Sequence, residues 1–459
     1  MATKPYQKAL FVFRRDLRLD DNTALLEALT LSQKTLPIFI IDPRQVGSSN
    51  TYRSQNCMQF MEESLNDLAS QLKKKKAKLY LFKGIAEKVI AKLVRQEKIE
   101  AVFLNKDYTP FSLTRDRAIE KLCAKHDIDY ISCNDALLNN PETIHTKSGT
   151  PYAVFTPFMK ACRRITVKKP QLCRKTNFYT GTVKGSDNTL LTTIFKKKNP
   201  ELWVHGGTKE AKKLLANIKR LNAYKKTRDF PALMTSNLSA HNKFGTISIR
   251  ELYHKISRTL SAASPLITQL YWRDFFYHVA YHSPFVFGQP YHEKYKNLWW
   301  SKSKKDFERW CSGTTGFPIV DAGMRQLNET GYMHNRTRMI VASFLTKDLH
   351  INWLWGERYF AQKLVDYDPC VNNGSWQWAA STGCDAQPYF RIFNPWLQQK
   401  KFDPECTYIK EWVPELKNIK PAIIHTWYRD TSPKIKDYPA PMVDHSIESA
   451  RAKQLFKEV

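Results

Sequence analysis

Hydrophobic positions in the first 135 residues form short apolar runs that are separated by segments with helical spacing. The runs lie at residues 9–13, 36–41, 78–82, 101–104 and 128–132. Apolar runs of this length, bounded by polar segments, are typical of strands that are buried on both faces. Five such strands alternating with helices predict a doubly wound α/β domain with a parallel sheet.

One segment between these strands, residues 54–72, has the pattern of an amphipathic helix. Its apolar residues recur at intervals of three and four, and they are Met58, Met61, Leu65, Leu68 and Leu72. This spacing predicts a stripe that packs against the sheet. The lysine-rich run at residues 73–78 follows directly, and we interpret it as the polar end of the helix before the next strand, although a localisation signal has the same composition.

Beyond the fifth strand the pattern changes twice. Residues 136–202 show weak periodicity and are interpreted as an irregular linker over the surface. Residues 203–459 are dominated by helical spacing, for example at 319–327 and 339–349, and predict a mostly α-helical domain. The chain is therefore expected to form an α/β domain over 1–135, a linker and a helical domain.

Aromatic residues are concentrated in the second half of the chain. All twelve tryptophans lie between Trp203 and Trp427, and the block at residues 365–378 is especially rich in aromatic and polar side chains. Such a block suits a buried redox cofactor or the stacking of nucleobases. An ordinary aromatic core is the alternative.

The charge of the chain indicates a polyanionic partner. The formal net charge is +29, from 72 Lys and Arg against 43 Asp and Glu. Nucleic acid is the first candidate for such an excess, and a basic surface that serves only solubility is the alternative.

Other function classes are disfavoured by what the sequence lacks. No segment approaches the ~20 apolar residues of a membrane span, and the N-terminus has no secretory signal, so we expect the protein inside the cell, in the cytoplasm or the nucleus. The nine cysteines show no C-x-x-C spacing, which favours reduced thiols over a zinc site or a disulfide framework. Residues 13–22, after the first strand, lack the glycines of a dinucleotide-binding turn.

Several ordered motifs resemble those of the photolyase and cryptochrome family. They lie at residues 11–18, 272–276, 316–325, 333–339 and 365–395, so the resemblance spans nearly the whole chain. The last two are most similar to class I cyclobutane pyrimidine dimer photolyases. The resemblance implies a DNA-binding flavoprotein and carbon–carbon lyase, in which photoexcited reduced FAD passes an electron to a flipped pyrimidine dimer. A (6-4) photolyase, a cryptochrome blue-light photoreceptor and a flavoprotein that binds nucleic acid without repair are the alternatives.

The resemblance implies two groups of FAD-binding residues. The group near the phosphates consists of Tyr224, Thr235, Ser236, Asn237, Leu238, Ser239 and Arg273. A simple helix cap is the alternative for residues 235–239. The group near the isoalloxazine consists of Arg338, Asp366, Asp368 and Asn372, in which Asn372 is expected to face the reactive nitrogen of the flavin. A purely structural ion pair is the alternative for Arg338 and Asp366.

Three tryptophans match the family's electron relay from the surface to the flavin. They are Trp376, Trp353 and Trp300, and Trp299 competes for the outermost position. Taken singly, each tryptophan would more often be a core residue than part of a relay, so the assignment depends on all three together.

The lesion pocket implied by the resemblance has aromatic walls and a basic rim. Trp272 and Trp378 match its walls, and Asn335 and Met339 match further pocket positions. Residues expected to bind phosphates without reading sequence are Lys160, Arg163, Arg164, Arg336, Arg391 and Lys401. Any of these cations is alternatively a solvated surface charge.

Two positions depart from the family pattern. Gln269 stands where dimer photolyases usually have a glutamate, and glutamine is more usual in (6-4) photolyases and animal cryptochromes. Asn335 and Met339, however, stand where (6-4) photolyases have two histidines, so the dimer substrate is favoured. Ser112 replaces the acidic residue expected for a folate antenna, which disfavours folate and leaves a deazaflavin, a second flavin or an empty site open. We expect a monomer that binds DNA containing pyrimidine dimers and no metal.

Overall fold

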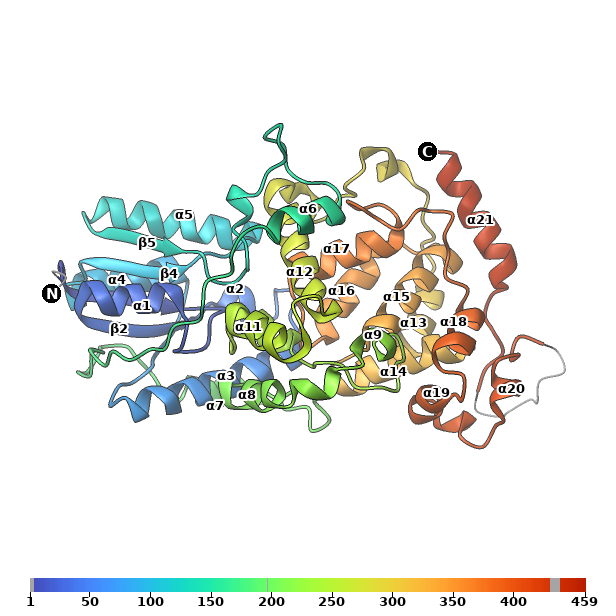
Figure 1. Cartoon of the computed structure of the whole chain (residues 1–459), viewed down its shortest axis with the longest axis horizontal. Coiled ribbons are helices and arrows are strands. Elements are labelled where there is room, and N and C mark those ends of the chain that lie inside the picture. Colours follow the sequence, from blue (N-terminus) through green and yellow to red (C-terminus); the bar gives the residue numbers. More distant parts are fainter. Residues whose placement is uncertain (1–3, 196, 430–437) are drawn as a thin grey trace.

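The N-terminal part of the chain forms a parallel sheet and the rest is mostly helical (Figure 1). A computed structural model describes residues 4–195, 197–429 and 438–459. The strands are β1 (Tyr6–Phe13), β2 (Ser32–Ile41), β3 (Tyr80–Lys83), β4 (Ala101–Asn105) and β5 (Asp129–Cys133). All pairs are parallel, in the order β3-β2-β1-β4-β5. The predicted fold class is confirmed.

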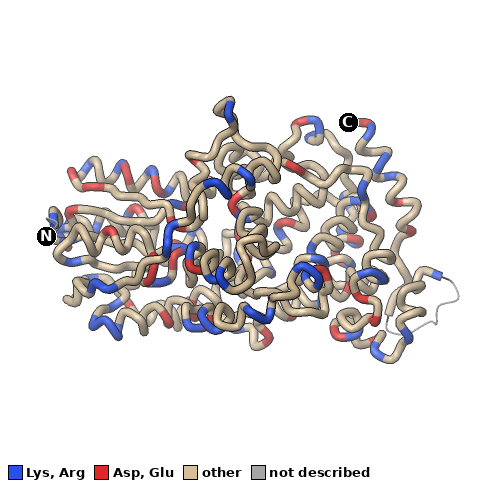
Figure 2. The backbone as a smooth tube through the Cα atoms, viewed as in Figure 1, with Lys and Arg blue, Asp and Glu red and all other residues tan. Residues whose placement is uncertain are grey.

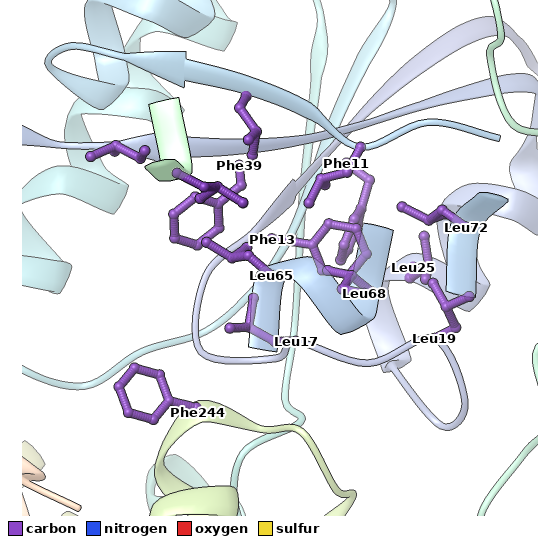
Figure 3. Close-up of a cluster of buried hydrophobic side chains, with 14 of the residues drawn as sticks. Phe11, Phe13, Leu17, Leu19, Leu25, Phe39, Leu65, Leu68, Leu72 and Phe244 are labelled. Carbon is purple, nitrogen blue, oxygen red and sulfur yellow. The ribbon is translucent and has the colours of Figure 1, made fainter. Parts of the chain in front are cut away.

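The alternation of side chains along β1 divides the core of this domain into two layers. Phe11 and Phe13 point into the cluster that contains the stripe of helix α3 (Gln55–Lys74), as Figure 3 shows. Leu10 and Val12 point to the other face, where helices α4 (Ala86–Glu97) and α5 (Pro110–Lys125) pack. A strand that is covered on both faces needs apolar residues at every position, which explains the continuous apolar run.

The predicted stripe of α3 is confirmed, with Met61 only partly buried and the other four residues buried. The lysines that follow it occupy the end of the helix and the turn before β3, as the structural interpretation expected.

The remaining helices complete the two faces of the sheet and build the helical domain. Before residue 203 they are α1 (Thr23–Leu31), α2 (Pro43–Val46), η1 (Pro141–Thr143), α6 (Phe155–Cys162) and α7 (Leu190–Ile194). From there to residue 300 they are α8 (Thr208–Ala216), η2 (Ile218–Leu221), α9 (Tyr224–Thr227), α10 (Ser239–Phe244), α11 (Ile249–Leu260), α12 (Pro265–His282), η3 (Pro284–Val286) and η4 (Glu293–Asn297). The last group is α13 (Lys304–Ser312), α14 (Pro318–Thr330), α15 (Asn335–Ser343), η5 (Phe344–Asp348), α16 (Trp353–Lys363), α17 (Pro369–Ala380), α18 (Pro395–Phe402), α19 (Thr407–Trp412), η6 (Pro414–Leu416), α20 (Pro421–Ile424) and α21 (His445–Lys457). Over the described ranges, no helix has the length and apolar character that a bilayer crossing needs.

Two sequence expectations are wrong in detail. The segment interpreted as an irregular linker contains helix α6, because its buried residues Phe155, Phe158 and Cys162 repeat at helical spacing and pack against α12. The single helix expected over 339–349 is interrupted, since α15 ends at Ser343 and a π-helical turn, η5, follows.

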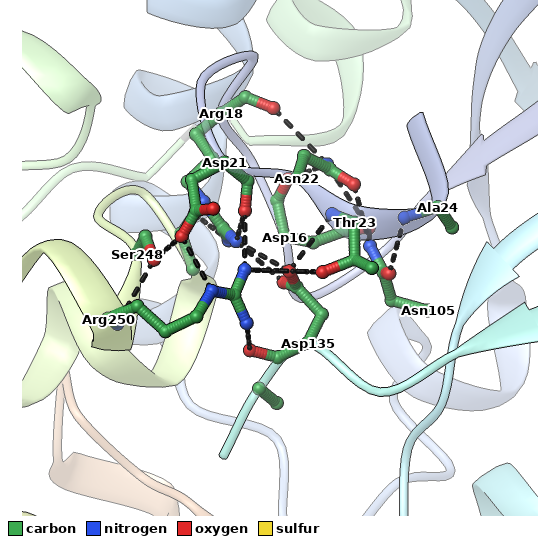
Figure 4. Close-up of polar contacts among 12 residues, drawn as sticks. Asp16, Arg18, Asp21, Asn22, Thr23, Ala24, Asn105, Asp135, Ser248 and Arg250 are labelled. Atoms are coloured by element: carbon green, nitrogen blue, oxygen red, sulfur yellow. Dashed lines mark hydrogen bonds and ion pairs between the residues drawn. The ribbon is translucent and has the colours of Figure 1, made fainter. Parts of the chain in front are cut away.

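A buried ion-pair network fastens the sheet to the helical domain (Figure 4). Asp135, which follows β5, accepts from Arg18 at 2.7 Å and from Arg250 of α11 at 2.9 Å. Arg250 also lies 2.7 Å from Asp21. Burial disfavours the charge on Asp135, but the two guanidiniums outweigh it and lower its pKa to about 2. The network holds α11 against the carboxyl edge of the sheet.

Candidate functional site

Three helices bring the separate sequence motifs together. Helix α17 packs against both α12 and α15, and α9 packs against α12. Because α12 carries the motif at residues 272–276, α15 the motif at 333–339 and α17 part of the block at 365–395, side chains that are far apart in the chain become neighbours.

The predicted pair between Arg338 and Asp366 is formed. Their closest nitrogen and oxygen are 3.0 Å apart, and the Asp366 side chain is only 5% exposed. Arg338 also donates to the carbonyl oxygen of Met333 at 2.8 Å. The buried carboxylate is thus compensated, as a charge in such a place requires.

Tyr332 connects this pair to the stretch predicted to bind phosphates. Its hydroxyl lies 3.1 Å from the hydroxyl of Thr235, and the Arg338 guanidinium lies 5.6 Å from the centre of its ring. The ring of Trp203 stacks on it with centroids 5.7 Å apart. Sequence reasoning did not single out Tyr332, although its position directly before the motif at 333–339 was a usable signal.

The stretch Thr235 to Ser239 does not act as a side-chain cap. Leu238 occupies the N-cap position of α10, and no side chain caps that helix within the described residues. Asn237 has a φ of +54°, in the left-handed region that Asn tolerates better than most residues, so the chain turns sharply here. The helix-cap alternative therefore does not explain these hydroxyl groups.

Several polar groups near this stretch lack protein partners and fit the phosphates and hydroxyl groups of FAD. The buried Oδ1 of Asn242, on α10, has no hydrogen-bond partner among the described residues. The phenol of Tyr224 makes no hydrogen bond in the same part of the chain, and burial raises its pKa to about 12, so it remains a donor. Arg273 donates to the carbonyl oxygens of Ala136 at 2.6 Å and Asn242 at 3.4 Å, and its further N–H groups have no hydrogen-bond partner among the described residues. Donors, one acceptor and a cation are what such a ligand requires.

Asp368 has a structural role that the sequence did not reveal. It is the N-cap of α17 and accepts from the main-chain N–H of Cys370 at 3.1 Å. It is also paired with Arg15, which follows β1, and accepts from the Tyr277 hydroxyl at 2.5 Å. Burial opposes the charge of Asp368, but Arg15, Arg273 and the Tyr277 hydroxyl together outweigh it and lower the pKa. The residue expected at the flavin edge thus also joins the two domains.

Asn372 is held by helix α16. Its Nδ2 donates to the carbonyl oxygen of Glu357 at 3.0 Å, and Asn373 donates to the Glu357 carboxylate at 3.2 Å. Burial raises the pKa of Glu357 to about 6. Glu357 orients the amide predicted to face the flavin, and no local sequence signal could have identified it, because the contact joins two different helices.

The three predicted relay tryptophans lie in one cluster with graded exposure. Trp376 and Trp353 are each 2% exposed, Trp300 is partly buried against the same cluster, and the competing Trp299 is 49% exposed. A bridge between Ser301 and Ile351 places Trp300 beside the chain that leads into Trp353. Helices α16 and α17, which carry the two inner tryptophans, pack together.

The predicted lesion residues lie on α12, α15 and α17. The Trp272 indole stacks on Phe155 with centroids 3.6 Å apart and an interplanar angle of 9°, which fixes its plane. Gln269 precedes it by three residues on α12 and is partly buried, and its side chain makes no hydrogen bond with the described residues. Asn335 lies on α15 with its Nδ2 3.6 Å from the sulfur of Met339, and Trp378 on α17 is partly buried.

Comparison with known proteins explains this arrangement. Residues 9–174 match the family model described as DNA photolyase, and residues 266–458 match the model described as the FAD binding domain of DNA photolyase. The chain belongs to the DNA photolyase family. A deoxyribodipyrimidine photo-lyase of Alkalihalophilus pseudofirmus is 40% identical, and the match covers 97% of each chain. The enzyme of the same name from Escherichia coli is 35% identical over 94% of this chain and 95% of its own.

Solved structures of the photolyase family agree over the whole length. An archaeal photolyase from Sulfolobus tokodaii, described with two FAD molecules, has a TM-score of 0.89 and 43% identity and covers 98% of this chain and all of its own. A class III photolyase from Agrobacterium tumefaciens has a TM-score of 0.90 and 33% identity, with 100% and 98% covered. A Synechocystis cryptochrome has a TM-score of 0.90 and 29% identity, with 99% and 100% covered.

The cations predicted at the rim of the lesion pocket differ in whether their charge is free to bind a phosphate. Arg336 is paired with Asp229 at 2.7 Å and lies 4.3 Å from the centre of the Phe402 ring, so its charge is already compensated. The remaining five predicted cations are exposed, and they are Lys160, Arg163, Arg164, Arg391 and Lys401.

Ser112, which stands where a folate antenna would require an acidic residue, is buried and held by hydrogen bonds to its neighbours. Ser112 is 2% exposed and donates to the Asp107 carboxylate at 2.9 Å. Thr109 donates to the Ser112 hydroxyl at 2.9 Å. An acidic side chain at this position would lie against Asp107, and the two like charges would repel.

Proposed function

We propose that this protein is a deoxyribodipyrimidine photo-lyase that uses light to split cyclobutane pyrimidine dimers in DNA. The observation that carries the proposal is that each of the packed helices α12, α15 and α17 carries both a residue predicted for FAD and a residue predicted for the lesion. The FAD residues on these helices are Arg273, Arg338 and Asn372, and the lesion residues are Trp272, Met339 and Trp378. Asn335 and Met339, the pair that disfavours a (6-4) substrate, touch one another on α15.

The proposal assigns binding and orienting roles to this chain's own residues. Bound FAD supplies light-driven electron transfer to the dimer, which no amino-acid side chain performs. Thr235, Ser236 and Tyr224 would hold the phosphate and sugar part by hydrogen bonds, with Asn242 as an additional acceptor. Arg338, Asp366 and Asn372 would orient the ring, and the contact with Glu357 would keep the Asn372 amide in place.

The lesion side of the site recognises a base pair that is already weakened. A dimer stacks and pairs poorly, so extruding it costs less than extruding intact bases, and indole walls recover stacking energy. Trp272 is suited to this because Phe155 fixes its plane. Gln269 would bond the dimer through its unpartnered amide, which stays neutral and holds no titratable proton, unlike the glutamate usual in dimer photolyases.

The decisive experiment illuminates reduced, purified protein with oligonucleotides that contain either a cyclobutane dimer or a (6-4) product. We expect repair of the dimer alone, measured by chromatography of the products. Repair of only the (6-4) product would make the substrate assignment wrong, and repair of neither would favour signalling or binding without repair.

A Gln269→Glu variant tests the departure at this position in the same assay. The carboxyl group is expected to raise the quantum yield of dimer repair, because it adds a group that can share a proton or charge with the dimer. An unchanged yield would mean that the rest of the site already compensates for glutamine. The matched control is Gln289→Glu, which lies outside α12.

A photoreceptor is the second candidate function, favoured by Gln269 and by the similarity to the Synechocystis cryptochrome. A reduced protein that shows flavin photochemistry but repairs neither lesion would support it.

For the antenna we propose a second flavin rather than folate. The Sulfolobus tokodaii photolyase, a structure with two FAD molecules that implies a novel light-harvesting cofactor, is 43% identical to this chain. The hydrogen bonds that close Ser112 are a second reason. Heat-released cofactors separated by chromatography are expected to contain two flavins per chain, whereas one flavin with a pterin would contradict the proposal.

A further inference from the structure

The connector that follows α6 carries an uninterrupted excess of positive charge. Between Glu142 and Asp187 the chain contains nine Lys and Arg and no Asp or Glu. Beyond Arg163 and Arg164, four of these cations follow one another along the irregular segment, and we call Lys168, Lys169, Arg174 and Lys175 the connector strip. All four are exposed. Figure 2 shows Lys and Arg gathered along this part of the chain.

The charges of the connector strip are not compensated within the protein. None of the four forms an ion pair with any residue that the structure describes, and Lys175 donates only to the Thr30 hydroxyl, at 3.1 Å. The two nearby carboxylates are engaged elsewhere. Asp20 lies 3.5 Å from Lys212, and Asp21 lies 2.7 Å from Arg250. A solvated surface usually mixes both signs of charge, so a strip of one sign indicates an external anion.

The backbone of the connector strip is held in place. Asp21 and Gln171 exchange two hydrogen bonds, from the Asp21 N–H at 2.6 Å and from the Gln171 N–H at 3.0 Å. The Cys173 N–H donates to Asp20 at 3.0 Å. The Nε2 atom of His254, on α11, lies 3.1 Å from each of the carbonyl oxygens of Val167 and Lys168. The cations are therefore presented from a fixed main chain, and little backbone entropy is lost when they bind.

The connector that carries the strip begins beside the proposed lesion pocket. Helix α6 ends at Cys162, and its Phe155 stacks on Trp272. Arg163 then contacts α12, with a nitrogen 3.4 Å from the Thr268 hydroxyl. From there the segment crosses the front of the molecule in Figure 1, past α11 and toward the sheet. The strip thus leads away from the pocket on one side only.

We propose that the connector strip binds the phosphates of duplex DNA that flanks the lesion on one side, beyond the pocket itself. This inference rests on the proposed function. The eleven Cα-to-Cα steps from Arg163 to Arg174 span about 36 Å when the chain is extended. That length corresponds to about ten base-pair steps at 3.4 Å each. Lysine and arginine grip phosphates independently of sequence, as an enzyme that must find lesions anywhere requires.

The test compares a triple variant of the connector strip with a control of equal charge. The variant is Lys168→Gln, Lys169→Gln and Arg174→Gln. The control is Lys88→Gln, Lys92→Gln and Arg95→Gln, three exposed cations on α4, which covers the opposite face of the sheet from α1. Binding is measured by fluorescence anisotropy over a range of salt concentrations. The duplexes carry a dimer and are short, extended on the 5′ side, or extended on the 3′ side.

The strip variant is expected to bind one of the two extended duplexes roughly ten- to a hundredfold more weakly, with a salt slope smaller by about 2–3. Binding of the short duplex, binding of the other extension and repair of the short duplex should stay unchanged, and the control should behave like the wild type. Equal losses in the strip variant and the control would reduce the effect to net charge and overturn the inference. Equal losses on short and extended duplexes would also overturn it.

The inference and the proposed function fail in different ways. If the wild type repairs dimers but the strip variant shows no loss that depends on duplex length, only the inference is wrong. If the wild type repairs nothing, the proposed function is wrong, and undamaged duplexes of the two lengths still test the strip through its salt slope.

Discussion

At the residue scale, Asp274 shows how burial can leave a carboxyl group poorly compensated. It is 1% exposed on α12, next to Arg273. One oxygen accepts from the N–H groups of Leu138 and Asn139 at 3.0 and 3.1 Å, while the other has no partner among the described residues. Burial outweighs Arg273 and these bonds and raises the pKa to about 7.

This raised pKa sets the sign of a pH effect on stability. The usual value is 3.8, so the folded state binds a proton more tightly than the unfolded state, and the contribution of Asp274 to stability declines as pH rises from about 4 to about 7. Asp274→Asn keeps the acceptor and removes the charge. We expect its thermal midpoint to exceed that of the wild type by roughly 3–8 °C at pH 8, and by much less at pH 5. An equal gain in thermal midpoint at both pH values would contradict this prediction. The control is Glu293→Gln, because the Glu293 side chain is 86% exposed.

A second prediction at this scale concerns Trp376. Replacing it by Phe should slow photoreduction of the oxidised flavin, because a phenyl ring is much harder to oxidise than an indole, while repair by enzyme that is already reduced stays the same. Transient absorption and the repair assay measure the two effects. Trp310→Phe is the control, since Trp310 is fully buried and lies 6.1 Å from Trp376 but is not in the proposed relay. Loss of both activities in Trp376→Phe would make the relay assignment wrong.

At the scale of elements, the close approach of α16 and α17 depends on a glycine. A Cβ atom at Gly356 would meet the indole of Trp376, and it would lie 2.6 Å from Leu345. These neighbours are buried, so moving them to make room would cost free energy. The absence of a side chain at position 356 therefore lets Trp376, the proposed inner relay tryptophan, lie against α16.

Gly356→Ala is expected to destabilise the protein by about 1–3 kcal/mol through overpacking. It should also change the rate of photoreduction, because Trp376 must shift. Ser375→Ala, at an exposed position on α17, is the control for both measurements. A variant with the thermal midpoint and photoreduction rate of the wild type would show that α16 and α17 separate without cost.

At the scale of the whole molecule, the joint between the domains depends on few charges. Arg250 bonds both Asp21 and Asp135, and Arg18 is the second cation on Asp135. Removing one partner of a buried network leaves an uncompensated charge. Because the pKa of Asp135 falls to about 2 from its usual 3.8, its stabilising contribution is present above about pH 4 and is lost as pH falls toward 2.

Arg250→Gln should therefore lower the thermal midpoint at pH 7 by several degrees and speed proteolysis within residues 163–189, where the connector crosses the joint. Mass spectrometry of the fragments locates the cuts. Arg258→Gln, an exposed cation on the same helix, is the control. Cleavage at the rate of the wild type would mean that other contacts, such as apolar packing and the Arg15–Asp368 pair, hold the domains without this network. The predicted limits at residues 135 and 203 and the monomeric state remain predictions, which the same fragments and light scattering would check.

Much of the fold could be predicted because it depends on local patterns. The five apolar runs became the five parallel strands, and the stripe from Met58 to Leu72 became the buried face of α3. A strand covered on both faces and a helix packed on one face each impose a period that is visible in a single segment. The π-helical turn at Phe344–Asp348 was missed, since the same apolar spacing suits an uninterrupted helix.

Less of the candidate site than of the fold could be predicted from the sequence. By itself the sequence determined which residue types were available, the layered sheet and the membership of the photolyase family, because these follow from periodicity and from motifs read in order. Only the tertiary structure decided the partners: Arg15 with Asp368, Tyr332 with Thr235, Glu357 with Asn372 and Asp229 with Arg336. Each pair joins separate elements, and the packing of those elements, which no single segment encodes, decides which polar groups can satisfy one another in a buried place.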